Sequence, residues 1–244
     1  KVQGFKASGI PCGIKKNGRR DLALILSDVP ARVAALFTTN GVKAAPVLID
    51  IARVKKGTAR AVIINSGNAN ACTGKKGHSD AIRMTALVEA ALGLEKGSVL
   101  VSSTGVIGVP LPVEKVEAGM KALVEGLSYV GLVDAGEAIM TTDAFMKTAS
   151  ASAVIGGRKV TIAGIAKGAG MICPNMATML AYFVTDCDVP VVALRKALKE
   201  ATGLSFNSII VDNDTSTNDT TMVFANGLAG NRPARYGSIE YRRF

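Results

Sequence analysis

The stretch "GMICPNMATML" (170–180) places Ala177 and Thr178 between a turn-like segment and a long apolar run. Glycine, proline and asparagine precede the pair, and these residues favour turns. The residues that follow, "TMLAYFVTD" (178–186), are typical of a buried strand bounded by polar residues. The stretch therefore predicts a loop that ends in a threonine, directly at the beginning of a core strand.

Further apolar runs closed by turn residues recur along the chain and predict strands. They lie at residues 22–27, 31–39, 60–67, 98–105, 159–168, 178–186 and 208–214. Apolar residues at helical spacing predict helices at 79–94, 112–127, 189–202 and 216–230. This mixed order favours an α/β or α+β fold with sheets covered by helices. The glycine- and alanine-rich residues 128–158 suggest a soft boundary within it.

Composition narrows the class of protein. The chain has 244 residues, of which 48% are hydrophobic and 20% charged, as expected of a globular protein with a sizeable core. It contains no apolar run of about 18 residues and no segment like a signal peptide, so we expect no membrane partner. The net charge of +10 favours small carboxylates as partners. The basic residues are scattered and tryptophan is absent, which argues against nucleic-acid binding.

Neither a metal site nor a histidine-based catalytic site is indicated. The four cysteines have no CxxC spacing, which is typical of a reducing compartment and predicts a cytoplasmic protein. The single histidine, His78, is interpreted as a solvated loop residue rather than a general base. The segment "DNDTSTND" (212–219) resembles half of a calcium loop but lacks its glycine and its bidentate glutamate. We interpret its polar side chains as caps of the helix expected after it.

A hydroxyl nucleophile without histidine needs another base. The α-amine of an N-terminal threonine can take the proton of its own hydroxyl, because such an amine titrates near neutrality. Cutting the chain before this threonine requires a small preceding residue, a strained peptide and donors for an oxyanion. Ala177 and Thr178 behind their turn segment fit that requirement. On these residues alone, a purely structural Ala-Thr pair is the simpler interpretation.

The wider segment "KGAGMICPNMATMLAYFVTDC" (167–187) closely resembles the self-cleavage site of the ornithine acetyltransferase family, the glutamate N-acetyltransferases of arginine biosynthesis. Five further segments resemble that family in its own order, so the resemblance covers nearly the whole chain. They are "FTTNGVKAAPV" (37–47), "INSGNANACTG" (64–74), "VSSTGVIGVPLP" (101–112), "AIMTTDAF" (138–145) and "DNDTSTNDTTMVFANGLAGN" (212–231). The resemblance implies the ornithine acetyltransferase/DmpA-like fold, with sheets sandwiched by helices.

The resemblance also implies an activity. The chain would cut itself between Ala177 and Thr178 into an α chain (1–177) and a β chain (178–244). Thr178 would then take the acetyl group of N-acetylornithine and pass it to glutamate. No metal or redox cofactor is implied, although some members of the family also accept acetyl-CoA. The expected assembly is an α2β2 heterotetramer of the cut chains.

Four further site positions follow from the resemblance. Thr104 and Gly105 of "SSTG" match the oxyanion hole, where a hydroxyl and a backbone N–H at a strand end can point at one oxygen. Thr141 and Lys167 match substrate-binding positions, as does Thr178 itself. A lysine beside glycines can hold a substrate carboxylate. The alternatives are a strand-ending turn for "SSTG" and a surface charge for Lys167.

The β-chain part departs from the family pattern. Family β chains are longer and carry a "DGEG"-like segment with a substrate-binding glutamate, followed by an asparagine and a serine or threonine that also bind. We therefore expect residues 1–244 alone to transfer acetyl groups poorly. Two other functions stay open: a self-cleaving aminopeptidase or amidase that uses water as the acceptor, and a non-catalytic remnant.

Overall fold

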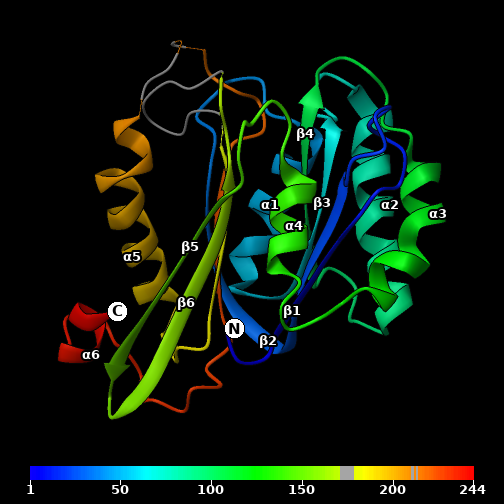
Figure 1. The fold of residues 1–244 in the computed structure, drawn as a ribbon. Coiled ribbons are helices and arrows are strands. Elements are labelled where there is room, and N and C mark those ends of the chain that lie inside the picture. The colour runs from blue at the N-terminus through cyan, green and yellow to red at the C-terminus, as the bar shows by residue number, and fades with distance from the viewer. Residues whose placement is uncertain (171–178, 210–211, 213) are drawn as a thin grey trace.

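The computed structural model describes residues 1–170, 179–209, 212 and 214–244 (Figure 1). Its strands are β1 Phe5–Ile10, β2 Leu22–Phe37, β3 Thr58–Asn68, β4 Val99–Val106, β5 Lys147–Ile155, β6 Arg158–Lys167, β7 Leu180–Thr185 and β8 Thr220–Ala225. Its helices are α1 Ala45–Arg53, α2 Gly74–Leu92, α3 Val113–Glu125, α4 Leu132–Ile139, α5 Val191–Leu204 and α6 Ile239–Arg243, with 3-10 turns at Val54–Lys56 and Phe206–Ser208.

The long strand β2 joins two facing layers of sheet. The hydrogen-bonded order is β4-β3-β2-β8-β7-β6-β5, and β1 pairs with β2 outside this path. The first part of β2 pairs with β1 and β3, and its last six residues pair with β8. The register of β2 against β3 shifts between Leu26 and Ala31, where the strand turns from one layer into the other. One continuous strand therefore closes the sandwich along one side.

Alternating residues of the strands fill the space between the two layers. Ile64 of β3 shares one buried cluster with Tyr182 of β7 and Phe224 of β8. Helix α4 packs into the same cluster through Ala138 and Ile139. Because successive side chains of a strand point to opposite faces, the intervening residues face outward and need a second cover.

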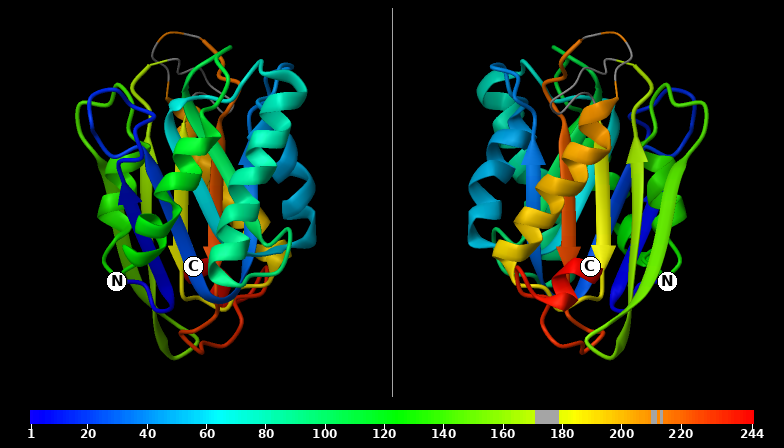
Figure 2. Two further views of the ribbon diagram at one scale, coloured as in Figure 1. Left: turned by 90° about the vertical axis from the view of Figure 1, so that its right-hand side faces the viewer. Right: turned by 90° about the vertical axis from the view of Figure 1, so that its left-hand side faces the viewer.

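Helices supply that cover on both sides. Helices α2 and α3 pack through Met84 and Val116 against Ile63 of β3. On the other side, Leu194 of α5 packs against Val223 of β8. Figure 2 shows α2 and α3 on one side of the molecule and α5 on the other. The order is helix, sheet, sheet, helix, which confirms the expected α/β fold with sheets sandwiched by helices.

Four of the expected strands, at 60–67, 98–105, 159–168 and 178–186, correspond to β3, β4, β6 and β7. The runs 22–27 and 31–39 form one strand, β2, rather than two. The helices expected at 79–94, 112–127 and 189–202 are present, although α2 begins at Gly74, before the expected serine cap. His78 is exposed as expected, but on this helix and not in a loop.

Two expectations were wrong, the helix at 216–230 and the boundary at 128–158. The helix expected at 216–230 is β8, whose six residues are all buried between β2 and β7. The polar residues before it therefore do not cap a helix. The strand expected at 208–214 stays a prediction, because residues 210, 211 and 213 lie outside the described residues; the four that are described belong to no strand. Residues 128–158 form no boundary either, since α4 contacts β1, β2 and β6, and β5 pairs with β6 along its whole length.

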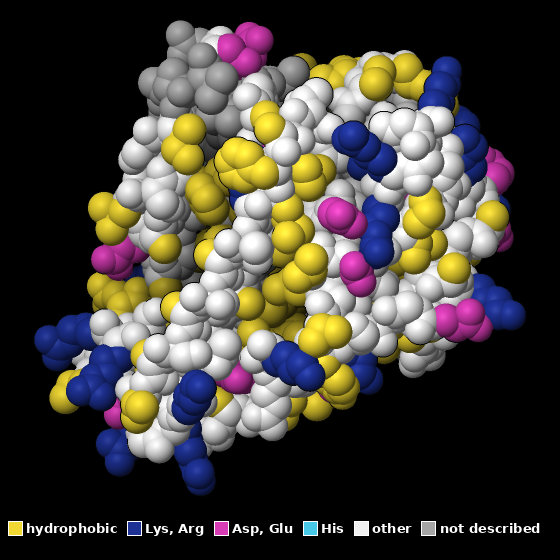
Figure 3. Space-filling model, viewed as in Figure 1, with side chains coloured by type: hydrophobic (Ala, Val, Ile, Leu, Met, Phe, Trp, Pro, Cys, Tyr) yellow, Lys and Arg dark blue, Asp and Glu magenta, His cyan; other side chains and the backbone are white. Residues whose placement is uncertain are grey.

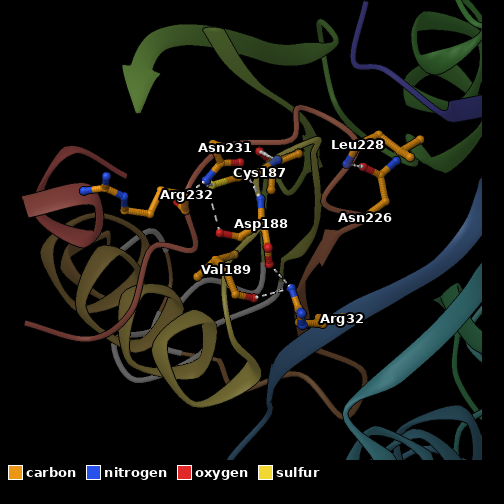
Figure 4. Close-up of polar contacts among 9 residues, drawn as sticks. Arg32, Cys187, Asp188, Val189, Asn226, Leu228, Asn231 and Arg232 are labelled. Carbon is orange, nitrogen blue, oxygen red and sulfur yellow. Dashed lines mark hydrogen bonds and ion pairs between the residues drawn. The ribbon is translucent and has the colours of Figure 1, made fainter. Parts of the chain in front are cut away.

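A polar network connects β2 to the segments that follow β7 and β8 (Figure 4). Arg32 of β2 forms an ion pair with Asp188, and the N–H of Asp188 donates to Asn231 Oδ1 at 2.8 Å. Asn231 Nδ2 in turn donates to the carbonyl of Arg232 at 2.8 Å. Burial raises the pKa of the neighbouring Cys187 thiol to about 12, so this cysteine stays protonated and unreactive at neutral pH.

The surface carries scattered positive charge. On the face in Figure 3, Lys and Arg side chains lie at the lower left, below the centre and on the right, with other side chains between them. Among the described helices, none is both long and apolar enough to cross a membrane.

Candidate active site

Several strand ends from both layers meet at one end of the sandwich, at the top of Figure 1. Lys167 at the end of β6 pairs with Leu180 at the start of β7, which pairs with Thr220 at the start of β8. Asn218 Nδ2, just before β8, donates to the carbonyl of Ser103 in β4 at 2.9 Å and so connects the layers. A cavity of about 470 Å³ lies at this end. Its described lining is Lys15, Asn17, Gly67, Ala69, Thr104, Gly105, Val106, Ile107, Thr141, Thr142, Lys167, Ala169, Gly170, Ser216 and Asn218.

Thr104 and Lys167 touch each other within this cavity. Lys167 is only 4% exposed, and its Nζ donates to Thr104 Oγ1 at 2.9 Å. An ammonium group can only donate, so the threonine oxygen accepts and its own hydrogen is left to point at a ligand. Burial lowers the pKa of Lys167, while the nearby carboxylates of Asp143 and Asp219 oppose this shift. The alternative of a surface charge for Lys167 is therefore wrong.

Gly105 occupies a position that only glycine fits. Its φ of 135° is rarely adopted by residues with a side chain. A Cβ atom here would lie 2.4 Å from the backbone carbon of Gly67 and 2.5 Å from the backbone nitrogen of Asn68. Gly67 is its register partner on β3, and the pairing becomes irregular one residue later. The "SSTG" segment thus ends a strand and also brings Thr104 and Gly105 to the cavity wall.

Buried asparagines fix the strand end that carries Thr104. Ser103 Oγ donates to Asn65 Oδ1 at 2.6 Å, and Asn65 Nδ2 donates to the carbonyl of Asn68 at 2.9 Å. Asn218 holds the same strand end from the other layer. These residues were not assigned a role from the sequence. The signal that could have found them is the clustering of asparagine at the end of β3 and just before β8.

Asp143 connects the loop of Thr141 to Gly168, the residue after Lys167, and sequence reasoning missed it. Its carboxylate accepts from the N–H of Thr141 at 3.2 Å and from the N–H of Gly168, next to Lys167, at 2.8 Å. Lys147 Nζ also donates to it at 2.7 Å. Burial alone would raise the pKa of Asp143, but Lys147 and the two N–H donors lower it overall. The ionised carboxylate therefore anchors the loop of Thr141 to the end of β6.

Ala177 and Thr178, the expected cleavage site and nucleophile, lie outside the described residues. The neighbouring Met179 is described, and its N–H donates to Asp219 Oδ1 at 2.9 Å. Within the described ranges, no group of three or more His, Cys, Asp or Glu side chains could hold a metal ion. Thr104, Gly105, Thr141 and Lys167 are all brought to one cavity. Their arrangement suits the binding of a carboxylate and the stabilisation of a developing oxyanion.

Comparison with known proteins places this cavity in a family context. Residues 6–243 match the model of the ArgJ family. The chain is 55% identical to the arginine biosynthesis bifunctional protein ArgJ of Geobacter sulfurreducens over 97% of its length and 60% of the relative's. It is 54% identical to the ArgJ protein of Symbiobacterium thermophilum, over 99% of its length and 60% of the relative's. The chain thus spans about 60% of the length of these relatives.

Solved structures agree with these matches. The ArgJ protein of Bacillus halodurans is 41% identical, with a TM-score of 0.66 over 72% of this chain and 92% of that one. The ornithine acetyltransferase of Mycobacterium tuberculosis, solved in complex with ornithine, is 39% identical, with a TM-score of 0.63 over 71% and 93% of the two chains. An aminopeptidase from Ochrobactrum anthropi with a variant Ntn hydrolase fold shares the fold alone, at 17% identity and a TM-score of 0.57 over 92% of this chain and 72% of that one. With a family model that matches nearly the whole chain and relatives more than half identical to it, the chain belongs to the ArgJ family.

Proposed function

We propose that this chain carries the acetyl-transfer chemistry of an ornithine acetyltransferase, or glutamate N-acetyltransferase, in arginine biosynthesis. Thr178, freed by cleavage after Ala177, takes the acetyl group from N-acetylornithine and passes it to glutamate. The observation that carries the proposal is the buried contact between Lys167 and Thr104, beside a Gly105 that no other residue can replace. In a member of the ArgJ family, this arrangement supports an oxyanion site formed by Thr104 and Gly105.

The first half-reaction forms an ester on Thr178. The α-amine of Thr178 takes the hydroxyl proton while the oxygen attacks the acetyl carbonyl carbon. The carbonyl electron pair moves onto its oxygen, which accepts hydrogen bonds from the Thr104 hydroxyl and the Gly105 N–H. When this intermediate collapses, the C–N bond breaks, the stored proton passes to the leaving nitrogen, and ornithine departs. Lys167 orients the Thr104 hydroxyl and adds positive charge behind it.

The second half-reaction reverses these steps with another amine. The amino group of glutamate attacks the ester carbonyl, the same two donors bind the oxygen, and the C–O bond to Thr178 breaks. The proton lost by the attacking nitrogen returns to the threonine. One acyl bond replaces another, so the proposal requires no oxidant, metal or cofactor. Acetyl-CoA is the alternative acetyl donor.

The assembly and location belong to the same proposal. The two fragments, 1–177 and 178–244, remain associated in an α2β2 heterotetramer in the cytoplasm. The fold supports the continued association of the two fragments. Strands β7 and β8 of fragment 178–244 lie in the core between β2 and β6 of fragment 1–177. Cutting the chain before β7 leaves every one of these pairings in place.

A second candidate, an aminopeptidase or amidase with water as the acceptor, is favoured by the shared fold of the Ochrobactrum enzyme. Incubation with N-acetylornithine and glutamate, followed by chromatography of the products, separates the candidates. We expect N-acetylglutamate and ornithine in equal amounts, formed slowly by residues 1–244 alone and detectable after long incubation. Free acetate without N-acetylglutamate would support the hydrolase. The absence of both products would contradict the proposal and support a non-catalytic remnant.

A further inference from the structure

The active-site cavity contains a second lysine with no role in the reaction described above. Lys15, in the loop between β1 and β2, lines the same cavity as Lys167. Among the lining residues that the structure describes, there is no aspartate or glutamate. Two lysines therefore line the cavity, and its described wall carries no acidic side chain.

The loop around Lys15 is held in place by a buried carboxylate. Asp21 is fully buried, and its two oxygens accept from the N–H of Lys15 at 2.8 Å and from the N–H of Cys12 at 2.6 Å. Lys15 Nζ donates to the carbonyl of Arg20 at 2.7 Å. An ammonium group has three N–H donors, so two remain for a ligand. The position of this cation is set before any ligand arrives.

The stem of Lys15 lies beside the proposed oxyanion site. A Cβ atom on Gly67 would come within 3.1 Å of Lys15 Cγ, so the lysine chain lies directly over this glycine. Gly67 is the register partner of Gly105. A ligand whose reacting carbon sits near Thr104 and Gly105 is therefore within reach of both lysines.

The two cations also affect each other. Burial lowers the pKa of Lys15, Asp21 and Asp143 oppose that shift, and the charges of Arg19 and Lys167 lower it further. Two ammonium groups that repel each other are relieved most by a ligand that brings two negative charges. Glutamate has two carboxylates. N-acetylornithine has one, together with a side-chain ammonium that two lysines would repel.

We propose that Lys15 binds the side-chain carboxylate of the glutamate acceptor, while Lys167 remains with Thr104 at the reacting end. This assignment rests on the proposed function. It makes Lys15 a specificity residue for the second half-reaction, in which the site must accept a dicarboxylate after ornithine has left.

Equilibrium binding tests this role without requiring turnover. Glutamate and glutamine, its uncharged isostere, are titrated calorimetrically into the wild type, Lys15→Met and Lys16→Met at one ionic strength. Lys15→Met keeps the apolar stem over Gly67 and removes the charge. Lys16→Met removes the same charge from the exposed neighbour, which does not line the cavity. A hydrogen bond to a charged group corresponds to about a tenfold difference in affinity or more.

We expect the wild type and Lys16→Met to bind glutamate at least about tenfold more tightly than glutamine. Lys15→Met should bind both alike, and Lys15→Arg, which restores the charge, should recover most of the preference. A glutamate preference that survives in Lys15→Met overturns the assignment, and so does a wild type without any preference. Acetyl transfer is assayed separately. Intact glutamate preference without transfer would contradict the proposed function and leave the role of Lys15 standing.

Discussion

Replacing Gly105 with alanine should disable the oxyanion site by a steric route that the structure defines. The new Cβ would lie 2.4 Å from Gly67 C and 2.5 Å from Asn68 N, where ordinary contacts begin at 3.4 Å. Both neighbours are backbone atoms of β3, so the strand ends must separate by about 1 Å, and such a misplacement can cost about 10²-fold in rate. The φ of 135° adds strain of about 1–3 kcal/mol.

We therefore expect Gly105→Ala to slow acetylation of Thr178 by about 10²- to 10³-fold, the usual cost of one oxyanion donor. The assay is a single turnover with N-acetylornithine, quenched in acid and followed by intact mass. Gly108→Ala is the matched control. Gly108 also has a positive φ, 79°, but nothing lies within 4 Å of the position of its Cβ.

The control isolates the clash from the backbone strain. The rate of Thr178 acetylation in Gly108→Ala should be within about threefold of the wild-type rate, since this substitution leaves the donors of the oxyanion site in place. Urea unfolding of both variants confirms that each is folded under the assay conditions. A Gly105→Ala protein within about threefold of the wild type would show that this position does not shape the oxyanion site, as would a Gly108→Ala protein that is slowed equally.

Two other substitutions test the groups around this site. Thr104→Ala should slow acetyl transfer by about 10²- to 10³-fold on pre-cleaved enzyme, while Thr104→Ser keeps the hydroxyl and most of the rate; an alanine variant within about threefold of the wild type would remove Thr104 from the oxyanion site. Asp143→Asn should lower the free energy of unfolding at pH 7 by about 1.5–3 kcal/mol, because it weakens hydrogen bonds to a charged acceptor. The folded-state pKa of Asp143 lies below its ordinary 3.8, so its stabilisation is present above pH 3.8 and is lost as the pH falls through the lowered value. The gap between wild type and variant in urea unfolding should therefore shrink toward pH 3, and a gap that stays constant would contradict the ionised role.

Local patterns were sufficient for the strands that alternate or end in clear turns, such as β3 and β4. They failed for β8, because the opposite layer covers one face of this strand and α5 covers the other, so all six residues are buried and no alternation of polar and apolar residues remains. The glycine and alanine residues near α4 were misinterpreted as a boundary. A Cβ on Gly131, directly before α4, would lie 1.9 Å from the carbonyl oxygen of Ala7 in β1, so small residues here allow β1 and α4 to pack closely.

The site was predictable only in part. Family resemblance pointed to Thr104, Gly105, Thr141 and Lys167, and the structure brings them to one cavity. The resemblance did not single out Asp143, whose partner Gly168 lies 25 residues away in the chain. Such contacts depend on how strands pair across the sheet, which no local spacing encodes.

The proposed acetyl transfer depends on Thr178 as an N-terminal nucleophile that carries the acetyl group. Intact mass under denaturing conditions, after incubation with N-acetylornithine alone, tests this most directly. We predict two fragments with the masses of residues 1–177 and 178–244, with one acetyl group on the smaller, removed when glutamate is added. Thr178→Ala should give one uncut, unacetylated chain. A wild type that stays whole after long incubation, or an acetyl group found on the larger fragment, would contradict the account.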